Sequence, residues 1–94
     1  MKPKTDPMTE YGFIPTLEAT LKDIDTTRNA LAVEAKVRPA TINELVSGNA
    51  KQINFKTLKE ILVALNRISA EKGFKKNYNV EDVFLLEDKD KDSQ

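Results

Sequence analysis

The 94-residue sequence contains no histidine and no cysteine. The first absence removes the side chain that most often serves as a general base or a metal ligand near neutral pH. The second excludes disulfide bonds and metal sites built from thiolates. Glycine is scarce, at three residues, and no glycine-rich phosphate loop is present. Catalysis would need paired carboxylates or an activated lysine or serine, so we expect a protein that is not an enzyme and that holds no cofactor or metal.

Long apolar segments are also missing. No apolar run approaches the roughly 20 residues of a transmembrane helix, and residues 1–10 lack the apolar stretch of a signal peptide. We therefore expect a cytoplasmic protein that does not enter a membrane. The chain length predicts one domain with one hydrophobic core.

Charge is balanced overall but unevenly distributed. The 15 basic and 15 acidic residues cancel. Residues 28–76 hold ten lysine and arginine residues and four glutamates, a net charge of +6. Residues 1–27 (three basic, five acidic) and 77–94 (two basic, six acidic) are acidic. A basic segment between acidic ends indicates either a surface for a polyanion or ordinary solvated helix surfaces.

Hydrophobic periodicity predicts four helices, at approximately residues 15–24, 28–36, 39–47 and 55–71. Pro15 and Pro39 suit first helical turns, and Thr27 and Asn54 suit N-cap positions. Phe55 is expected to belong to the apolar stripe of the last helix. The expected core is centred on Leu17, Leu21, Leu31, Ile42, Leu45, Leu58 and Leu62.

The two ends of the chain lack helical patterning. Residues 1–10 contain two prolines and no periodicity, so we expect a flexible N-terminal segment. Residues 88–94 contain no apolar residue, which predicts a disordered acidic tail. The domain is then expected to span residues 11–87.

Two shorter features complete the predicted fold. Residues 79–82 have the pattern of a single capped turn, and residues 83–86 form an apolar extended segment. We expect this segment to pair with residues 11–14, because two short strands can persist when helices support them. The predicted fold is all-α, a compact bundle of four to five helices with this two-stranded pairing of the N- and C-terminal ends.

The most informative stretch is Thr27 to Gly48, TRNALAVEAKVRPATINELVSG. It predicts two short helices that meet across a turn of about four residues, with small alanines at 32 and 35 where close packing needs them. This pattern resembles the phage-repressor or Cro-like helix-turn-helix family, also called Xre-like. The resemblance continues through residues 49–66, and residues 80–86 are similar to the closing "Asp-Leu-Leu" element of a compact branch, so it covers roughly residues 13–87.

This resemblance implies a sequence-specific DNA-binding transcriptional regulator, a repressor, whose helix 39–47 reads the major groove of double-stranded DNA. The exposed positions of that helix would be Arg38, Ala40, Thr41, Asn43 and Glu44. Asparagine can bond adenine in two places, glutamate can accept from cytosine, and alanine and threonine methyl groups can contact thymine. Thr27 and Arg28 at the preceding helix start, and Lys51 in the following loop, are expected at phosphates, with Lys56 as a further candidate.

Three positions depart from the family pattern. Lys36 stands where the family usually has a left-handed glycine, and Arg38 stands where serine or threonine usually caps the helix. Glu44 places a negative charge close to phosphates. The alternative is therefore a protein-binding helix-turn-helix module, antitoxin-like or antirepressor-like, which docks a partner protein instead of DNA.

A partner copy is expected because one recognition helix reads few base pairs. Helix-turn-helix proteins usually bind as two-fold dimers on half-sites about 34 Å apart. We expect either a homodimer, formed through apolar residues left exposed at 84–86 and 11–14, or assembly on the DNA itself. The same surface would receive a partner protein in the docking alternative.

Overall fold

The observed elements follow the predicted order, with one additional helix near the N-terminus. The computed structural model describes residues 6–87, and the predicted tail at 88–94 lies outside this range. The elements are α1 (Pro7–Glu10), β1 (Phe13–Pro15), α2 (Leu17–Asp23), α3 (Arg28–Ala35), α4 (Pro39–Ser47), α5 (Phe55–Glu71), the 3-10 turn η1 (Val80–Asp82) and β2 (Phe84–Leu86). The described chain is thus mostly helical with one small sheet. None of its helices has both the length and the apolar character needed to cross a membrane.

Side-chain caps define the starts of α3 and α5. The Thr27 side-chain oxygen accepts a hydrogen bond from the Ala30 N–H at 3.0 Å. The Asn54 side-chain oxygen accepts one from the Thr57 N–H at 2.7 Å. Each cap satisfies a backbone donor that a helix start leaves unpaired, so both predicted caps are confirmed.

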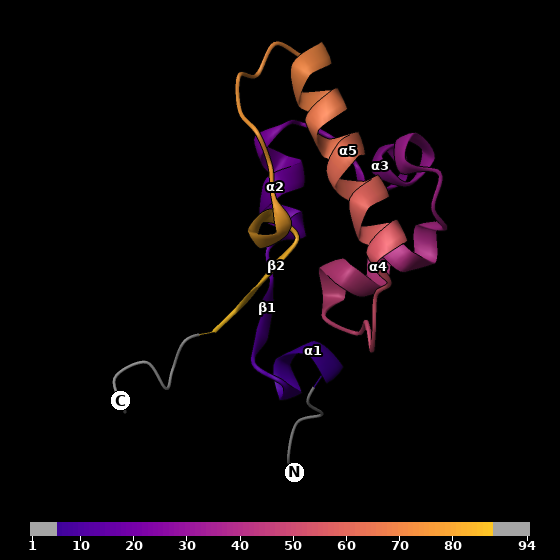
Figure 1. Ribbon diagram of the computed structural model, residues 1–94, viewed down its shortest axis with the longest axis vertical. Coiled ribbons are helices and arrows are strands. Elements are labelled where there is room, and N and C mark those ends of the chain that lie inside the picture. Colours follow the sequence, from indigo (N-terminus) through magenta and orange to yellow (C-terminus); the bar gives the residue numbers. More distant parts are fainter. Residues whose placement is uncertain (1–5, 88–94) are drawn as a thin grey trace.

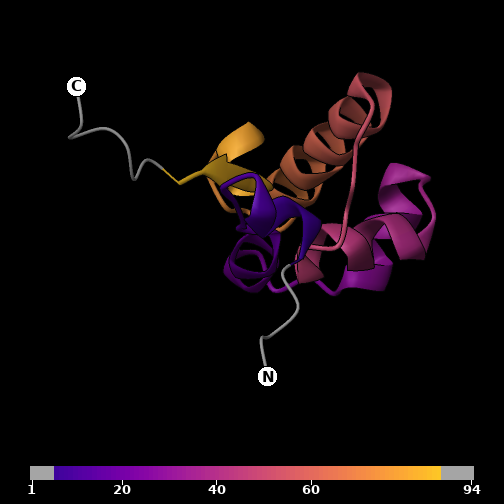
Figure 2. The same cartoon turned by 90° about the horizontal axis from the view of Figure 1, so that it is seen from below.

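The core surrounds α5. Figure 1 shows α3 on one side of α5, α2 with the sheet on the other, and α4 below the start of α5, and Figure 2 shows these elements from below. α3 packs against both α4 and α5. Five of the predicted core residues are buried, at 2% exposure or less: Leu17, Leu21, Leu31, Ile42 and Leu45. The other two, Leu58 and Leu62, are partly buried and pack against this core.

The strands β1 and β2 join the two ends of the described chain. They are antiparallel, and Ile14 lies opposite Leu85. The rings of Phe13 and Phe84 meet edge to face with centroids 5.6 Å apart, a favourable aromatic geometry. The predicted pairing is confirmed. Pro15 belongs to this strand, however, and not to the first turn of a helix, since α2 begins only at Leu17.

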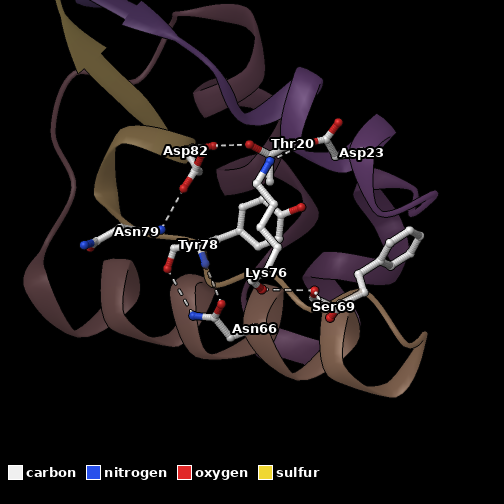
Figure 3. A network of polar contacts seen from close by, with 9 residues as sticks. Thr20, Asp23, Asn66, Ser69, Lys76, Tyr78, Asn79 and Asp82 are labelled. Atoms are coloured by element: carbon white, nitrogen blue, oxygen red, sulfur yellow. Dashed lines mark hydrogen bonds and ion pairs between the residues drawn. The ribbon is translucent and has the colours of Figure 1, made fainter.

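The C-terminal segment, defined here as residues 74–83, is bonded to α5 (Figure 3). The Asn66 side chain donates to the Tyr78 carbonyl at 3.1 Å and accepts from the Tyr78 N–H at 2.6 Å. The buried Ser69 hydroxyl lies 3.1 Å from the Phe74 carbonyl oxygen and 3.2 Å from that of Lys76. Two polar side chains of α5 therefore satisfy backbone groups of a segment that has little regular structure.

Contacts with α2 fix the other side of the C-terminal segment. The Thr20 hydroxyl donates to the Asp82 carbonyl at 2.7 Å. Lys76 Nζ lies 3.1 Å from Asp23 Oδ2 and 5.3 Å from the centre of the Tyr78 ring, and Figure 3 shows its chain crossing that ring. The hydrogen bond and the charge of Asp23 raise the pKa of Lys76 above its ordinary value, so this lysine keeps its charge throughout the neutral range.

Two regions differ from the sequence expectation. Residues 7–10, predicted within a flexible segment, form α1; Met8 is buried, and its N–H donates to the Gly48 carbonyl at 3.1 Å. A four-residue helix is too short to show periodicity, although Pro7 suits its first position. The prediction that Phe55 continues the apolar stripe of α5 is wrong. Phe55 is 87% exposed, because it stands one turn ahead of the first core-facing residue, Leu58.

Candidate nucleic-acid interface

Three residues, Lys36 to Arg38, connect α3 to α4. The backbone of Lys36 adopts the left-handed helical conformation, with φ 61° and ψ 42°. Its N–H donates to the Val33 carbonyl, and the Val37 N–H donates to the Ala32 carbonyl, which closes the last turn of α3. A lysine in this conformation costs on the order of 1 kcal/mol relative to glycine. The family resemblance predicts a glycine in the left-handed conformation at this position. The protein has the same backbone conformation there, but the residue is a lysine.

The helix α4 divides its residues between core and surface. Ile42 and Leu45 are buried, whereas Ala40, Asn43 and Glu44 are exposed. Thr41 is half-buried. The inward and outward sides of α4 are thus those that helical periodicity predicts, except that Thr41, expected to be exposed, is half-buried.

The start of α4 differs from the capped starts of α3 and α5. Arg38 occupies the N-cap position and is exposed, but its side chain makes no capping hydrogen bond. Pro39 follows at the first helical position, where its missing N–H is not needed. The arginine that stands in place of the usual serine or threonine thus leaves this helix start without a side-chain cap. Backbone N–H groups of the first turn of α4 therefore lack a side-chain acceptor from Arg38.

Arg28 connects the start of α3 with the outer side of α4. Its Nη1 donates to Asn43 Oδ1 at 3.2 Å, and its Nε lies 3.3 Å from Glu18 Oε1. The Arg28 and Glu18 side chains are about half exposed, and ion pairs of this kind contribute at most about 1 kcal/mol. The fold thus brings two predicted site residues, Arg28 and Asn43, into contact through an interaction that a ligand can replace.

The loop after α4 begins with a compact turn. The N–H groups of Gly48, Asn49 and Ala50 all lie 2.9 to 3.2 Å from the Glu44 carbonyl oxygen, and Gly48 is left-handed at φ 89°. This turn ends α4 and leaves Lys51 exposed in the loop. Among residues 6–87, the side chain of Lys51 has no ion-pair or hydrogen-bond partner, and the same holds for Arg38.

A polar hollow of about 410 Å³ lies between α4 and the start of α5. Its lining consists of Thr41, Glu44, Gln52, Ile53, Asn54 and Thr57. Gln52 is a candidate that sequence reasoning missed. It lines the same hollow as Thr41 and Glu44 of α4, and no local pattern in the sequence indicates this placement.

We call the surface made by the start of α3, the outer side of α4 and the loop to α5 the α3–α4 face. It consists of the predicted site residues Thr27, Arg28, Arg38, Ala40, Thr41, Asn43, Glu44 and Lys51, together with Gln52. Thr27, which caps α3, is exposed beside Arg28. The face carries three cations and one carboxylate of its own, with Glu18 paired to Arg28 at its border. The described residues contain no acidic cluster that could hold a metal ion.

Comparisons with protein-family models, with curated proteins and with solved structures found no match. The functional argument therefore depends on the geometry and chemistry of the α3–α4 face.

Proposed function

We propose that this protein binds double-stranded DNA through the α3–α4 face and represses transcription, with α4 lying in the major groove. The observation that carries this proposal is the hydrogen bond between Arg28 and Asn43. It places a cation suited to a phosphate next to an amide suited to a base edge, on one exposed surface. DNA recognition requires both kinds of contact side by side.

Asn43 keeps the groups that adenine requires. Its Oδ1 has two lone pairs, and Arg28 uses one of them. One acceptor and both N–H donors of the amide remain, which matches the donor and acceptor pair on the major-groove edge of adenine. Ala40 and Thr41 supply methyl groups for thymine on the same side of α4. Glu44 would accept from cytosine and would be repelled from positions close to phosphate.

The phosphate contacts surround this reading surface. Arg28 stands at the start of α3 beside the Thr27 cap, Arg38 is the N-cap residue of α4, and Lys51 is exposed in the loop after α4. Within residues 6–87, Arg38 and Lys51 have no ion pair to break before they bind phosphate. Arg28 must exchange Glu18 for phosphate, a small cost for a half-exposed pair.

A second copy would extend the contact with DNA. Tyr11, Ile14 and Leu86 are 73%, 40% and 60% exposed, and they lie on or beside the two-stranded sheet. We propose that these residues form a homodimer contact, or that two copies assemble on the DNA. Sedimentation with and without a palindromic site separates the two outcomes.

One observation favours the alternative of a protein-docking module. An apolar cavity of about 200 Å³ lies between α1, the sheet and the loop after α4, and its lining includes Met8, Tyr11, Phe13 and Ile53. A cavity of this size is smaller than typical ligand pockets and matches an apolar side chain of a protein partner. In this alternative the protein has no salt-dependent affinity for DNA.

The deciding experiment is a selection of bound sequences from random DNA at two salt concentrations, followed by titrations of variants. Arg28→Ala and Lys51→Ala should each weaken binding about equally for all sequences and reduce the slope of log K against log salt by roughly one contact. Lys75→Ala, an exposed lysine outside the α3–α4 face, is the matched control and should bind like the parent. If the parent selects no sequence and shows no salt-dependent binding, the DNA proposal is rejected.

A further inference from the structure

Phe55 is the most exposed large apolar side chain in the described range, at 87%. It is the first residue of α5, and its ring does not pack in the hydrophobic core. Phenylalanine is also a weaker helix former than alanine or lysine, so the helix gains nothing from an aromatic ring at this position. The fold therefore does not account for a phenyl ring in water, whose exposure is unfavourable.

Phe55 lies next to residues of the polar hollow that borders the α3–α4 face. Asn54, which precedes it, and Thr57, two residues after it, line the polar hollow together with Thr41 and Glu44 of α4. The ring therefore emerges from the helix turn that borders the proposed reading surface.

Two lysines lie near Phe55 along the chain, and two carboxylates accompany them, Glu44 at the polar hollow and Glu60 in an ion pair with Lys56. Lys51 precedes Phe55 in the loop and has no ion-pair partner within residues 6–87. Lys56 follows it directly, is 83% exposed, and pairs with Glu60 at 2.7 Å one turn along α5. Such an exposed pair within one helix is weak, so Lys56 is able to turn toward an anion. An apolar ring that follows Lys51 and precedes Lys56 along the chain suits a ligand that alternates negative and apolar groups.

We propose that the Phe55 ring packs against a deoxyribose of the DNA backbone, between the phosphates that Lys51 and Lys56 contact. This inference rests on the proposed DNA binding. The backbone of DNA alternates charged phosphates with sugars that present carbon and hydrogen, which is the alternation that these three side chains match. Phe55 is thus a positioning contact that fixes α4 in the groove without reading a base.

A sugar contact has a signature that lysine contacts lack. The ring is uncharged and releases no counterions, so its removal lowers affinity without changing the salt slope. Because every nucleotide carries the same sugar, the loss is equal for all sequences. A ring that touched a thymine methyl group would instead show a sequence-dependent loss.

The test compares Phe55→Ala with Phe74→Ala, the same chemical change beyond the other end of α5, in titrations of the full chain against the selected site and unrelated duplexes at several salt concentrations. We expect Phe55→Ala to lose about three- to tenfold in affinity on every duplex, with an unchanged salt slope, and Phe55→Leu to recover part of the loss. Phe74→Ala should bind like the parent. The urea midpoint of Phe55→Ala should equal that of the parent, because the side chain is exposed.

The failure of this inference differs from the failure of the proposed function. If Phe55→Ala binds like the parent while Arg28→Ala binds more weakly, the sugar contact is wrong and DNA binding stands. A loss confined to certain sequences, or a changed salt slope, also overturns the sugar contact. A parent protein without affinity for DNA removes both proposals.

Discussion

The two sides of α5 use polar side chains in different ways. On the side of the C-terminal segment, Asn66, Ser69 and Thr20 are buried or half-buried, and each bonds to backbone groups. On the side of the α3–α4 face, the polar side chains other than the half-buried Thr41 are exposed, and Arg28 and Asn43 bond to other side chains. Figure 1 shows the C-terminal segment and α3 on opposite sides of α5, with α4 below the start of α5.

This difference separates stability from binding. A buried side chain that satisfies a backbone group leaves that group unpaired when it is removed, so its loss is costly. An exposed contact between two side chains is replaced by water at little cost. We therefore expect substitutions beside the C-terminal segment to change the free energy of unfolding, and substitutions on the α3–α4 face to change affinity.

The largest effect on the free energy of unfolding is expected in α4, which has a buried side that stabilises the fold and an exposed side proposed to bind DNA. Leu45 is on the buried side of α4 at 1% exposure, and Leu45→Ala should lower the free energy of unfolding by about 2–5 kcal/mol through lost burial and a residual cavity. Asn43→Ala, on the exposed side of α4, should change it by less than about 0.5 kcal/mol. Urea unfolding measures both. Equal losses of stability in the two variants would show that the outer side of α4 also stabilises the fold.

An intermediate effect is expected at Asn66. Asn66→Ala leaves the N–H and the carbonyl of Tyr78 without their side-chain partner, and should cost about 1–3 kcal/mol in urea unfolding. Asn77→Ala, an exposed asparagine in the C-terminal segment, is the control and should be close to neutral. Under conditions where Asn66→Ala remains folded, its DNA affinity should match that of the parent. A lower DNA affinity of this folded variant would show that the side of α5 next to the C-terminal segment also contributes to binding.

The smallest expected effect is a gain in stability at Lys36. Lys36→Gly removes the side chain from a left-handed position and should raise the free energy of unfolding by up to about 1 kcal/mol, less the greater freedom of glycine in the unfolded chain. Lys36→Ala keeps the unfavourable conformation and should show no gain. Thermal unfolding of both variants measures the difference. If alanine stabilises as much as glycine, charge and not backbone conformation is the cause.

The elements defined by local chemistry were predictable from the sequence. The bounds of α3, α4 and α5 agree with the expected helices within a residue, because Thr27, Pro39 and Asn54 act on the backbone next to them. The β1–β2 pairing was also expected, since both segments are short and apolar between turns. The predicted helix start at Pro15 was two residues early because strand pairing overrides the preference of proline for a first helical turn.

The contacts within the candidate site were not predictable. Periodicity placed Asn43 on the outer side of α4, but the bond from Arg28 depends on how two helices cross. The approach of Gln52 to α4 depends on the path of a loop. The exposure of Phe55 follows from where the core ends along α5, which the spacing of apolar residues does not show.

The pairing of β1 with β2 has a consequence for the order in which the chain folds. Phe13 and Leu86 meet across nearly the whole described sequence, and the entropy lost in closing a loop grows with its length. Two three-residue strands cannot compensate for that loss alone, so we expect them to pair only after the helices have packed, and to separate first. Amide hydrogen exchange should then be faster at Ile14 and Leu85 than at buried residues of α5. If the strand amides exchange as slowly as those of α5, the sheet and the helices open as one unit.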